Sequence, residues 1–217
     1  MIEAVVFDMD GVLIDSQPFW QTAQLEILSQ LGVPITRQDT IDTTGVRIDH
    51  IVQQCYHKTP WDSVSCEEVC GRIMNRVKDL VQQRKPAMPG LDHAIDVCRS
   101  LELKLALASS SPISLIHTTI EALQLDGVFE VKASGENLRY GKPHPEVYLN
   151  ACHELNVVPE RCVAIEDSFV GLLAAKAARM NVIVIPEPSS ADQENLLIAD
   201  YQLASLTELT SDLFQSF

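Results

Sequence analysis

Short apolar runs rich in β-branched residues recur along the chain and predict the strands of a parallel sheet. The runs occupy residues 2–7, 103–108, 129–133, 162–165 and 182–185. Continuous apolar runs of this length are typical of strands that are buried on both faces. Stretches with helical apolar spacing separate them, over residues 91–101, 113–123, 147–155 and 172–178. The alternation predicts an α/β fold, in which helices cover both faces of the sheet.

Residues 15–85 interrupt this alternation, because three helical stretches follow one another there with no strand pattern between them. Ser16 stands at the start of the first stretch, where we expect its side chain to cap the helix. Ser65 begins a capping-box pattern at the start of the third stretch. The predicted domains are therefore a helical cap, residues 15–85, and an α/β core, residues 1–14 and 86–217.

Composition excludes several classes of partner. The 217 residues include 16 Lys and Arg against 30 Asp and Glu, which gives a formal net charge of −14 at pH 7. Such a chain would be repelled by nucleic acid and by acidic membrane surfaces, so neither is expected as a partner. Residues 15–85 hold nine acidic and eight basic side chains, so the excess negative charge belongs to the predicted core.

The sequence carries no apolar run long enough to span a bilayer and no secretory signal pattern, which predicts a cytoplasmic protein. Its six cysteines lack metal-binding spacing, so neither a zinc site nor a disulfide framework is expected. No coiled-coil pattern or long apolar stripe calls for a second subunit, and we expect a monomer.

Polar side chains follow the predicted strands at the points where the strands end. In an open parallel sheet, ligands bind beyond the carboxyl ends of the strands, so these side chains are expected to face one site. The set comprises Asp8 and Asp10, Ser109 and Ser110, Lys142, and Glu166 with Asp167. Two carboxylates about 4 Å apart repel by roughly 4 kcal/mol at an effective dielectric constant of about 20. A hard divalent cation with oxygen ligands relieves this repulsion, so the cluster predicts Mg²⁺.

The chain resembles the haloacid dehalogenase-like hydrolase superfamily over essentially its whole length. Residues 8–13, Ser109, Lys142 in its Gly-Lys-Pro-His-Pro segment, and the Glu-Asp pair at 166–167 stand in the order of the four motifs of that family. Within the superfamily, the chain is similar to the sugar-phosphate phosphatases close to β-phosphoglucomutase. The segments around residues 107–112 and 141–148 look most like bacterial hexitol-phosphate and 2-deoxyglucose-6-phosphate phosphatases. The resemblance implies a Rossmann-like core with an inserted helical cap.

The same resemblance implies catalytic roles for four residues. Asp8 would attack phosphorus and form an aspartyl phosphate, and Asp10 would act as general acid and then as general base. Ser109 and Lys142 would hold the phosphoryl group and balance its charge, and Ser110 would assist in binding it.

For the metal, the resemblance implies that Mg²⁺ is held by Asp8, by the main-chain carbonyl of Asp10 and by Asp167, with Mn²⁺ or Co²⁺ able to substitute. Glu166 would be either a further ligand or an outer-shell partner.

The cap is expected to select the substrate. Arg47, in the loop of residues 43–47, is placed to contact a sugar hydroxyl or phosphate. Trp20 stands where β-phosphoglucomutase-type members carry a histidine, which favours hydrolysis over return of the phosphate to a bound sugar. The predicted function is Mg²⁺-dependent hydrolysis of a hexose 6-phosphate, 2-deoxyglucose 6-phosphate or hexitol phosphate. The alternatives are a phosphosugar mutase, a phosphoglycolate phosphatase and a non-catalytic, flavodoxin-like binding module.

Overall fold

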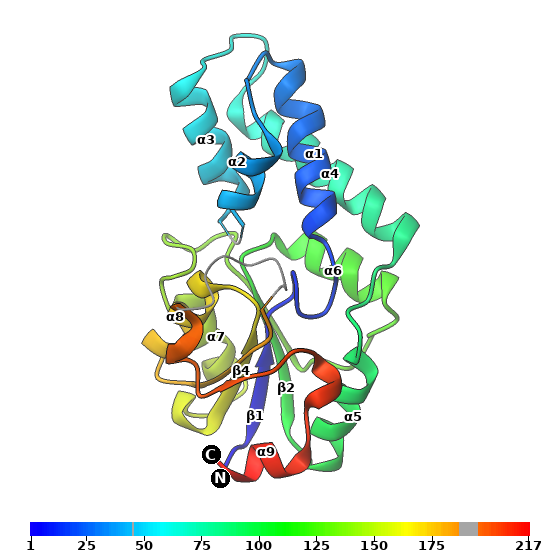
Figure 1. Cartoon of the computed structure of the whole chain (residues 1–217), viewed down its shortest axis with the longest axis vertical. Coiled ribbons are helices and arrows are strands. Elements are labelled where there is room, and N and C mark those ends of the chain that lie inside the picture. The colour runs from blue at the N-terminus through cyan, green and yellow to red at the C-terminus, as the bar shows by residue number, and fades with distance from the viewer. Residues whose placement is uncertain (45, 187–194) are drawn as a thin grey trace.

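The computed structural model describes residues 1–44, 46–186 and 195–217 of the chain. The described strands form a parallel sheet with the order β3-β2-β1-β4-β5-β6, which lies in the lower half of the molecule in Figure 1. Its strands are β1 (Ala4–Phe7), β2 (Lys104–Ser109), β3 (Val131–Ser134), β4 (Cys162–Glu166), β5 (Asn181–Val184) and β6 (Tyr201–Gln202). The predicted α/β fold is confirmed. The edge strand β6 was not predicted, because two residues are too short to leave a recognisable pattern.

Alternate residues of β1 point to opposite faces of the sheet. Val5 and Phe7 belong to the hydrophobic cluster on one face, and Ala4 and Val6 belong to the cluster on the other. All four are fully buried, which explains why the run is continuously apolar. The covering helices are α5 (Leu91–Ser100) and α6 (Ile113–Ala122) on the first face, and α7 (Glu146–Glu154) and α8 (Phe169–Ala177) on the second.

Short elements complete the core. They are η1 (Pro159–Arg161), η2 (Asn195–Ile198), η3 (Leu206–Glu208) and α9 (Ser211–Gln215). Leu206, Leu209 and Phe214 join the same hydrophobic cluster as α5, so the C-terminal segment packs on that face of the sheet. Among the helices that the structure describes, none combines the length and the apolar character that crossing a membrane requires.

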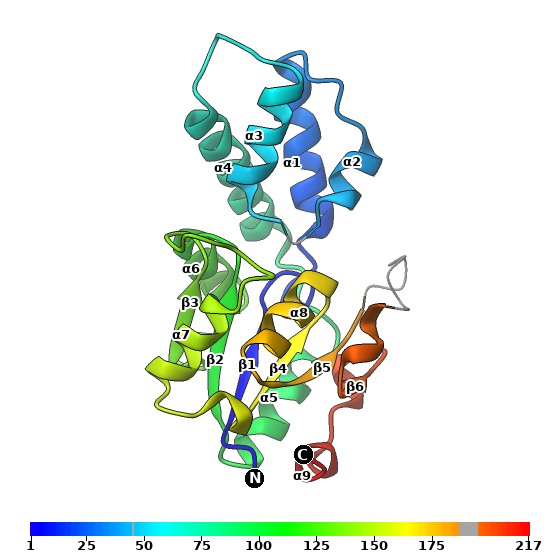
Figure 2. The same cartoon turned by 90° about the vertical axis from the view of Figure 1, so that its left-hand side faces the viewer.

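Four helices lie beyond the carboxyl ends of the strands, at the top of both views (Figure 2). They are α1 (Gln17–Gln30), α2 (Arg37–Asp42), α3 (Ile48–Lys58) and α4 (Cys66–Arg84). The sequence pattern predicted three helices in this segment, and the additional one is α2. Thr36 and Asp39 start α2 with a reciprocal capping box, which stabilises a helix too short to show an apolar stripe.

Ser16 does not cap α1 as predicted. It occupies the N-cap position, but its backbone is already helical (φ −92°, ψ −12°) and its side chain makes no capping bond. Its hydroxyl instead donates to the carboxyl group of Asp10. At the start of α4, Ser65 does accept from the Glu68 N–H at 3.1 Å, which is one half of the predicted capping box, and the Glu68 carboxylate accepts from Arg72.

Gly171 allows α8 to pack closely against the end of β4. A Cβ atom at this position would lie 1.9 Å from Oε1 of Glu166, whose side chain is completely buried. The helical Gly71 of α4 offers a contrast, because a Cβ there would meet nothing within 4 Å. Close packing therefore requires glycine at position 171 but not at position 71.

We expect the two matched glycine-to-alanine substitutions to change stability in opposite directions. Gly71→Ala should raise the free energy of unfolding by about 0.5–1 kcal/mol through better helix propensity. Gly171→Ala should lower it by about 1–3 kcal/mol, because the buried Glu166 carboxylate has to move. Urea denaturation of both variants measures the difference. A Gly171→Ala protein as stable as the wild type would contradict the packing argument.

Candidate active site

A buried lysine joins two carboxylates at the carboxyl edge of the sheet. Nζ of Lys142, in the loop after β3, lies 2.6 Å from Oδ1 of Asp8 and 2.6 Å from Oε1 of Glu166. The Lys142 side chain is only 4% exposed. The main-chain N–H of Asp8 donates to the Ile165 carbonyl at 2.9 Å, which ties the end of β1 to β4. The strand order reverses between these two strands, and ligands bind at such points in open α/β sheets.

Both carboxylate oxygens of Glu166 already have protein donors. Oε1 accepts from Lys142 and, at 2.5 Å, from the hydroxyl of the buried Tyr148. Oε2 accepts from the Asp167 N–H at 3.2 Å and from the Ser168 hydroxyl at 3.1 Å. A metal ion would therefore have to displace a protein donor to bind Glu166 directly. Tyr148 was not predicted from the sequence, because its position in α7 is indistinguishable from that of a core residue on an apolar helix face.

Asp10 is held by three side chains. Its Oδ1 accepts from the Ser16 hydroxyl and, at 3.0 Å, from the indole N–H of Trp20, and its Oδ2 accepts from the Ser111 hydroxyl at 2.7 Å. Ser16 and Trp20 stand four residues apart at the start of α1, so both reach the same carboxylate. The sequence did not assign Ser16 or Ser111 a role in the site, and it treated Trp20 only as the replacement for a histidine. Ser111 and Asp10 are 101 residues apart in the sequence, so local spacing cannot predict their hydrogen bond.

The residues predicted to bind phosphate surround one cavity. Ser109 ends β2 with 1% of its surface exposed, and its oxygen accepts from the Ser111 N–H at 3.0 Å. The hydroxyl proton of Ser109 therefore stays free to donate. The cavity is lined by Asp8, Asp10, Gln17, Thr44, Ser109, Ser110, Lys142, Asp167 and Ser168. Strand ends that are far apart in the sequence thus contribute carboxylates, hydroxyls and an ammonium group to one small space.

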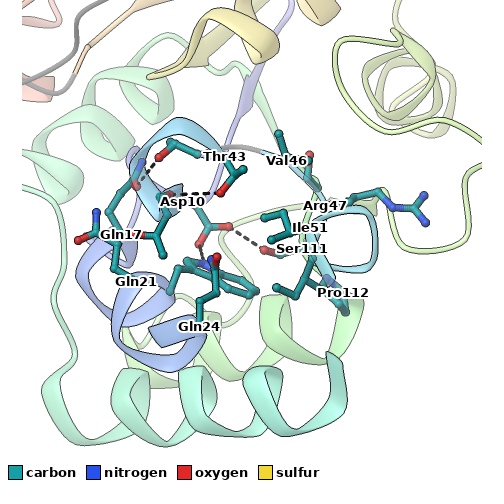
Figure 3. Close-up of a pocket in the computed structure, with 15 residues that line it drawn as sticks. Asp10, Gln17, Gln21, Gln24, Thr43, Val46, Arg47, Ile51, Ser111 and Pro112 are labelled. Atoms are coloured by element: carbon teal, nitrogen blue, oxygen red, sulfur yellow. Dashed lines mark hydrogen bonds between the residues drawn. The ribbon is translucent and has the colours of Figure 1, made fainter. Parts of the chain in front are cut away.

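Arg47 lies beside a second pocket, and its guanidinium group has other partners. It donates to both carboxylate oxygens of Asp49 and to the carbonyl oxygens of Gly135, at 3.1 Å, and Leu138, at 2.7 Å. Figure 3 shows the end of this side chain directed away from the other residues that line the pocket. In this arrangement, Arg47 links the start of α3 to the loop after β3. Its role as a substrate contact stays a prediction, and Gly45 of the same loop lies outside the described residues.

The ionisable groups Asp8, Glu166, Asp167 and Lys142 lie close together, and negative charges outnumber positive ones among them. Burial raises the pKa of Asp8 to about 7 despite the neighbouring Lys142, and burial together with Glu166 holds the pKa of Asp167 well above its ordinary value. Burial lowers the pKa of Lys142, but Asp8 and Glu166 outweigh it and raise that pKa overall. When ionised, the three carboxylates and one ammonium group carry two net negative charges.

The donor set fits one divalent cation. Carboxylate oxygens of Asp8, Glu166 and Asp167 lie within 4.8 Å of one another. Asp8 and Asp167 offer the hard oxygen donors that suit Mg²⁺, and Glu166 lies beside them with both of its oxygens bound by protein donors. Gly11, with φ of +83°, leaves the room that the Asp167 carboxylate occupies, since a Cβ there would lie 2.0 Å from its Oδ2. The local backbone is thus shaped around this carboxylate.

The sheet order, the carboxylates at the reversal point and the helical insertion define a Rossmann-like α/β enzyme with a cap over its site. The family model for "Haloacid dehalogenase-like hydrolase" matches residues 5–185, and the chain belongs to this family. The family resemblance that the sequence motifs carry is therefore confirmed.

The chain is 43% identical over 211 residues to "Hexitol phosphatase B" of Escherichia coli K12, covering 97% of this chain and 95% of that protein. It is 33% identical over 202 residues to "Phosphorylated carbohydrates phosphatase" of Thermotoga maritima, covering 91% of each. Among solved structures, β-phosphoglucomutase of Clostridium difficile superposes with a TM-score of 0.88 at 24% identity, covering 100% of this chain and 96% of that one. At this identity, the last likeness concerns the fold alone.

We expect Mg²⁺ to stabilise the protein through this cluster. At a concentration of about 100 Kd, the gain of roughly 2.7 kcal/mol should raise Tm by about 5–10 °C. Asp167→Asn should remove most of this shift, because it removes a charged ligand. The exposed Asp126 provides the control, since Asp126→Asn should keep the full shift. Thermal unfolding with and without Mg²⁺ measures the effect, and an unchanged shift in Asp167→Asn would contradict the assignment.

Proposed function

We propose that the protein is a Mg²⁺-dependent phosphatase of small sugar or sugar-alcohol phosphates. The observation that carries the proposal is the arrangement of Asp8, held by Lys142, beside a cavity that Ser109, Ser110 and Asp167 also line. A carboxylate, hydroxyl donors and a buried cation in one cavity suit the transfer of a phosphoryl group. The two relatives described above support the substrate class, because both are named as phosphatases of phosphorylated sugars or sugar alcohols.

In the proposed reaction, a carboxylate oxygen of Asp8 attacks phosphorus and the bond from phosphorus to the sugar oxygen breaks. Asp10 gives its proton to the leaving oxygen. Asp10 then takes a proton from a water molecule, which attacks the aspartyl phosphate and releases inorganic phosphate and free Asp8. Asp10 suits this role because it lines both the phosphate cavity and the neighbouring pocket, and three hydrogen bonds hold its carboxylate there.

The Asp8 side chain, the main-chain carbonyl of Asp10 and Asp167 would hold Mg²⁺. When bound, the ion supplies positive charge that offsets the charge of the phosphoryl oxygens. Glu166 would act as an outer-shell partner, because Lys142, Tyr148 and main-chain donors occupy both of its oxygens. Its proposed task is to fix the Lys142 ammonium group against Asp8.

A phosphosugar mutase is the alternative within the same fold. A mutase has to hold a second phosphate, and a phosphoglycolate phosphatase has to hold a carboxylate, so each needs a cation beyond Lys142. Among the described residues that line the neighbouring pocket, Arg47 is the one cationic side chain, and its guanidinium group is engaged by Asp49 and two carbonyl groups. This supports hydrolysis of a monophosphate. A binding module of flavodoxin type would have no use for Asp10 beside Asp8.

We expect Asp8→Asn to lower phosphate release from hexose and hexitol phosphates by at least about a thousandfold, because the nucleophile is lost. EDTA should likewise abolish activity of the wild type, and added Mg²⁺ should restore it. The assay measures free phosphate and, with β-glucose 1-phosphate, also glucose 6-phosphate. Activity of Asp8→Asn at the wild-type level would refute the mechanism. Formation of glucose 6-phosphate with little free phosphate would establish the mutase instead.

We expect Asp10→Asn to lower kcat by about 10²–10⁴-fold, the usual contribution of general acid–base catalysis. Binding of inorganic phosphate, measured by calorimetry, should change little, because the Lys142 and Ser109 contacts remain. Asp15 is a nearby exposed carboxylate, and Asp15→Asn serves as the control with nearly normal turnover. Unchanged turnover in Asp10→Asn would remove this residue from the reaction.

A further inference from the structure

A pocket between the cap and the core continues from the phosphate cavity. Asp10, Gln17, Thr44 and Ser110 line both spaces, so a ligand whose phosphate lies beside Asp8 would extend its remaining atoms into the pocket. Part of the lining consists of apolar or aromatic groups, and they are Trp20, Val46, Ile48, Ile51 and Pro112. The remaining lining residues carry mostly amides and hydroxyls. A mixed lining of this kind suits a ligand that presents both C–H and O–H groups.

The amides of the lining come from one helix. Gln17, Gln21 and Gln24 stand at helical spacing on α1 and line the pocket together with Thr40, Thr43 and Thr44 (Figure 3). Oε1 of Gln17 already accepts from the Thr44 hydroxyl at 3.1 Å. The row of amides thus begins at the phosphate cavity and runs into the cap.

Gln24 differs from Gln17. It is only 4% exposed, and its Oε1 has no hydrogen-bond donor among the described residues. Buried amide groups in folded proteins nearly always have partners, and an exception calls for a reason. Here the reason lies in the pocket, because Gln24 is one of its lining residues. A ligand hydroxyl that donates to Oε1 would supply the missing hydrogen bond.

The charges around the pocket indicate which ligand fits. Its two charged side chains among the described residues are Asp10 and Arg47. Asp10 accepts hydrogen bonds from three side chains, and the guanidinium group of Arg47 binds Asp49 and two carbonyl oxygens. The amide of Gln24 supplies no charge to the pocket. A second phosphate or a carboxylate would find no free cation there.

We infer that Gln24 is a specificity-determining residue, which accepts a hydrogen bond from a hydroxyl of an uncharged polyol or sugar chain that carries one phosphate. The inference rests on the proposed phosphatase function and adds the group that recognises the part of the substrate remote from phosphorus. It also explains why a polar side chain stands in the buried face of α1, where an apolar residue would pack without an unmet acceptor.

Gln24→Met tests the inference, because methionine has a similar length and shape but no amide. We expect kcat/KM for a hexitol 6-phosphate to fall roughly tenfold more than kcat/KM for p-nitrophenyl phosphate, which has no sugar hydroxyl. The loss should appear mainly in KM, because the hydrogen bond forms before and during the reaction. The ligand-free variant should have a Tm equal to or above that of the wild type, since an unpaired buried acceptor is removed. Gln30→Met, at an exposed position of the same helix, is the control.

A second variant, Gln24→Leu, keeps the test independent of any folding defect in the first. With a series of hexitol phosphates that lack one hydroxyl each, the analogue missing the recognised hydroxyl should lose kcat/KM with the wild type but not with Gln24→Leu. Equal losses on hexitol phosphate and on p-nitrophenyl phosphate, or a lowered Tm with no change in the ratio, would overturn the inference and leave the phosphatase intact. A wild type that hydrolyses neither substrate would overturn both.

Discussion

The buried ammonium group of Lys142 is the interaction on which the site depends. It lies 2.6 Å from a carboxylate oxygen of Asp8 and 2.6 Å from one of Glu166, and thereby links β1, β4 and the loop after β3. Removing one partner of a buried ion pair typically costs about 3–5 kcal/mol, because the other charge is left without compensation. The geometry around Asp8 is therefore fixed by electrostatics as well as by packing. Tyr148 and Gly171 extend this constraint, since one donates to Glu166 and the other leaves space for it.

The core and the helical cap differ in net charge, and they also differ in the kinds of side chain that they bring to the site. The core, residues 1–14 and 86–217, carries the excess of acidic residues, and Asp8, Glu166 and Asp167 lie together at one edge of its sheet. The helices above the edge are nearly neutral in charge and supply amides, hydroxyls and apolar side chains. This division agrees with the proposal that the core holds the phosphate and that the cap contacts the rest of the substrate.

Asp10 belongs to the core and Gln24 to the cap. The contacts of both residues show that helix α1 of the cap forms part of the site. Asp10 belongs to the core motif, yet two of its three hydrogen-bond donors, Ser16 and Trp20, come from the first turn of α1 or directly before it. Gln24 belongs to α1 and has an acceptor that the described protein leaves unmet. A movement of α1 would alter both at once. The proposed roles of Asp10 and Gln24 therefore both depend on the position of α1.

The sequence by itself determined the α/β class, the family and the set of strand-end residues, because apolar periodicity and short motifs are local properties. Asp8, Ser109 and Lys142 could be named without coordinates since each directly follows a strand or stands in a recognisable segment. The tertiary structure alone decided which groups these residues touch. In the folded chain, Ser16 donates to Asp10 and does not cap its helix, and Arg47 pairs with Asp49. Lys142 and Tyr148 both donate to Glu166. Hydrogen bonds between distant segments depend on three-dimensional distance, and linear spacing does not record that distance.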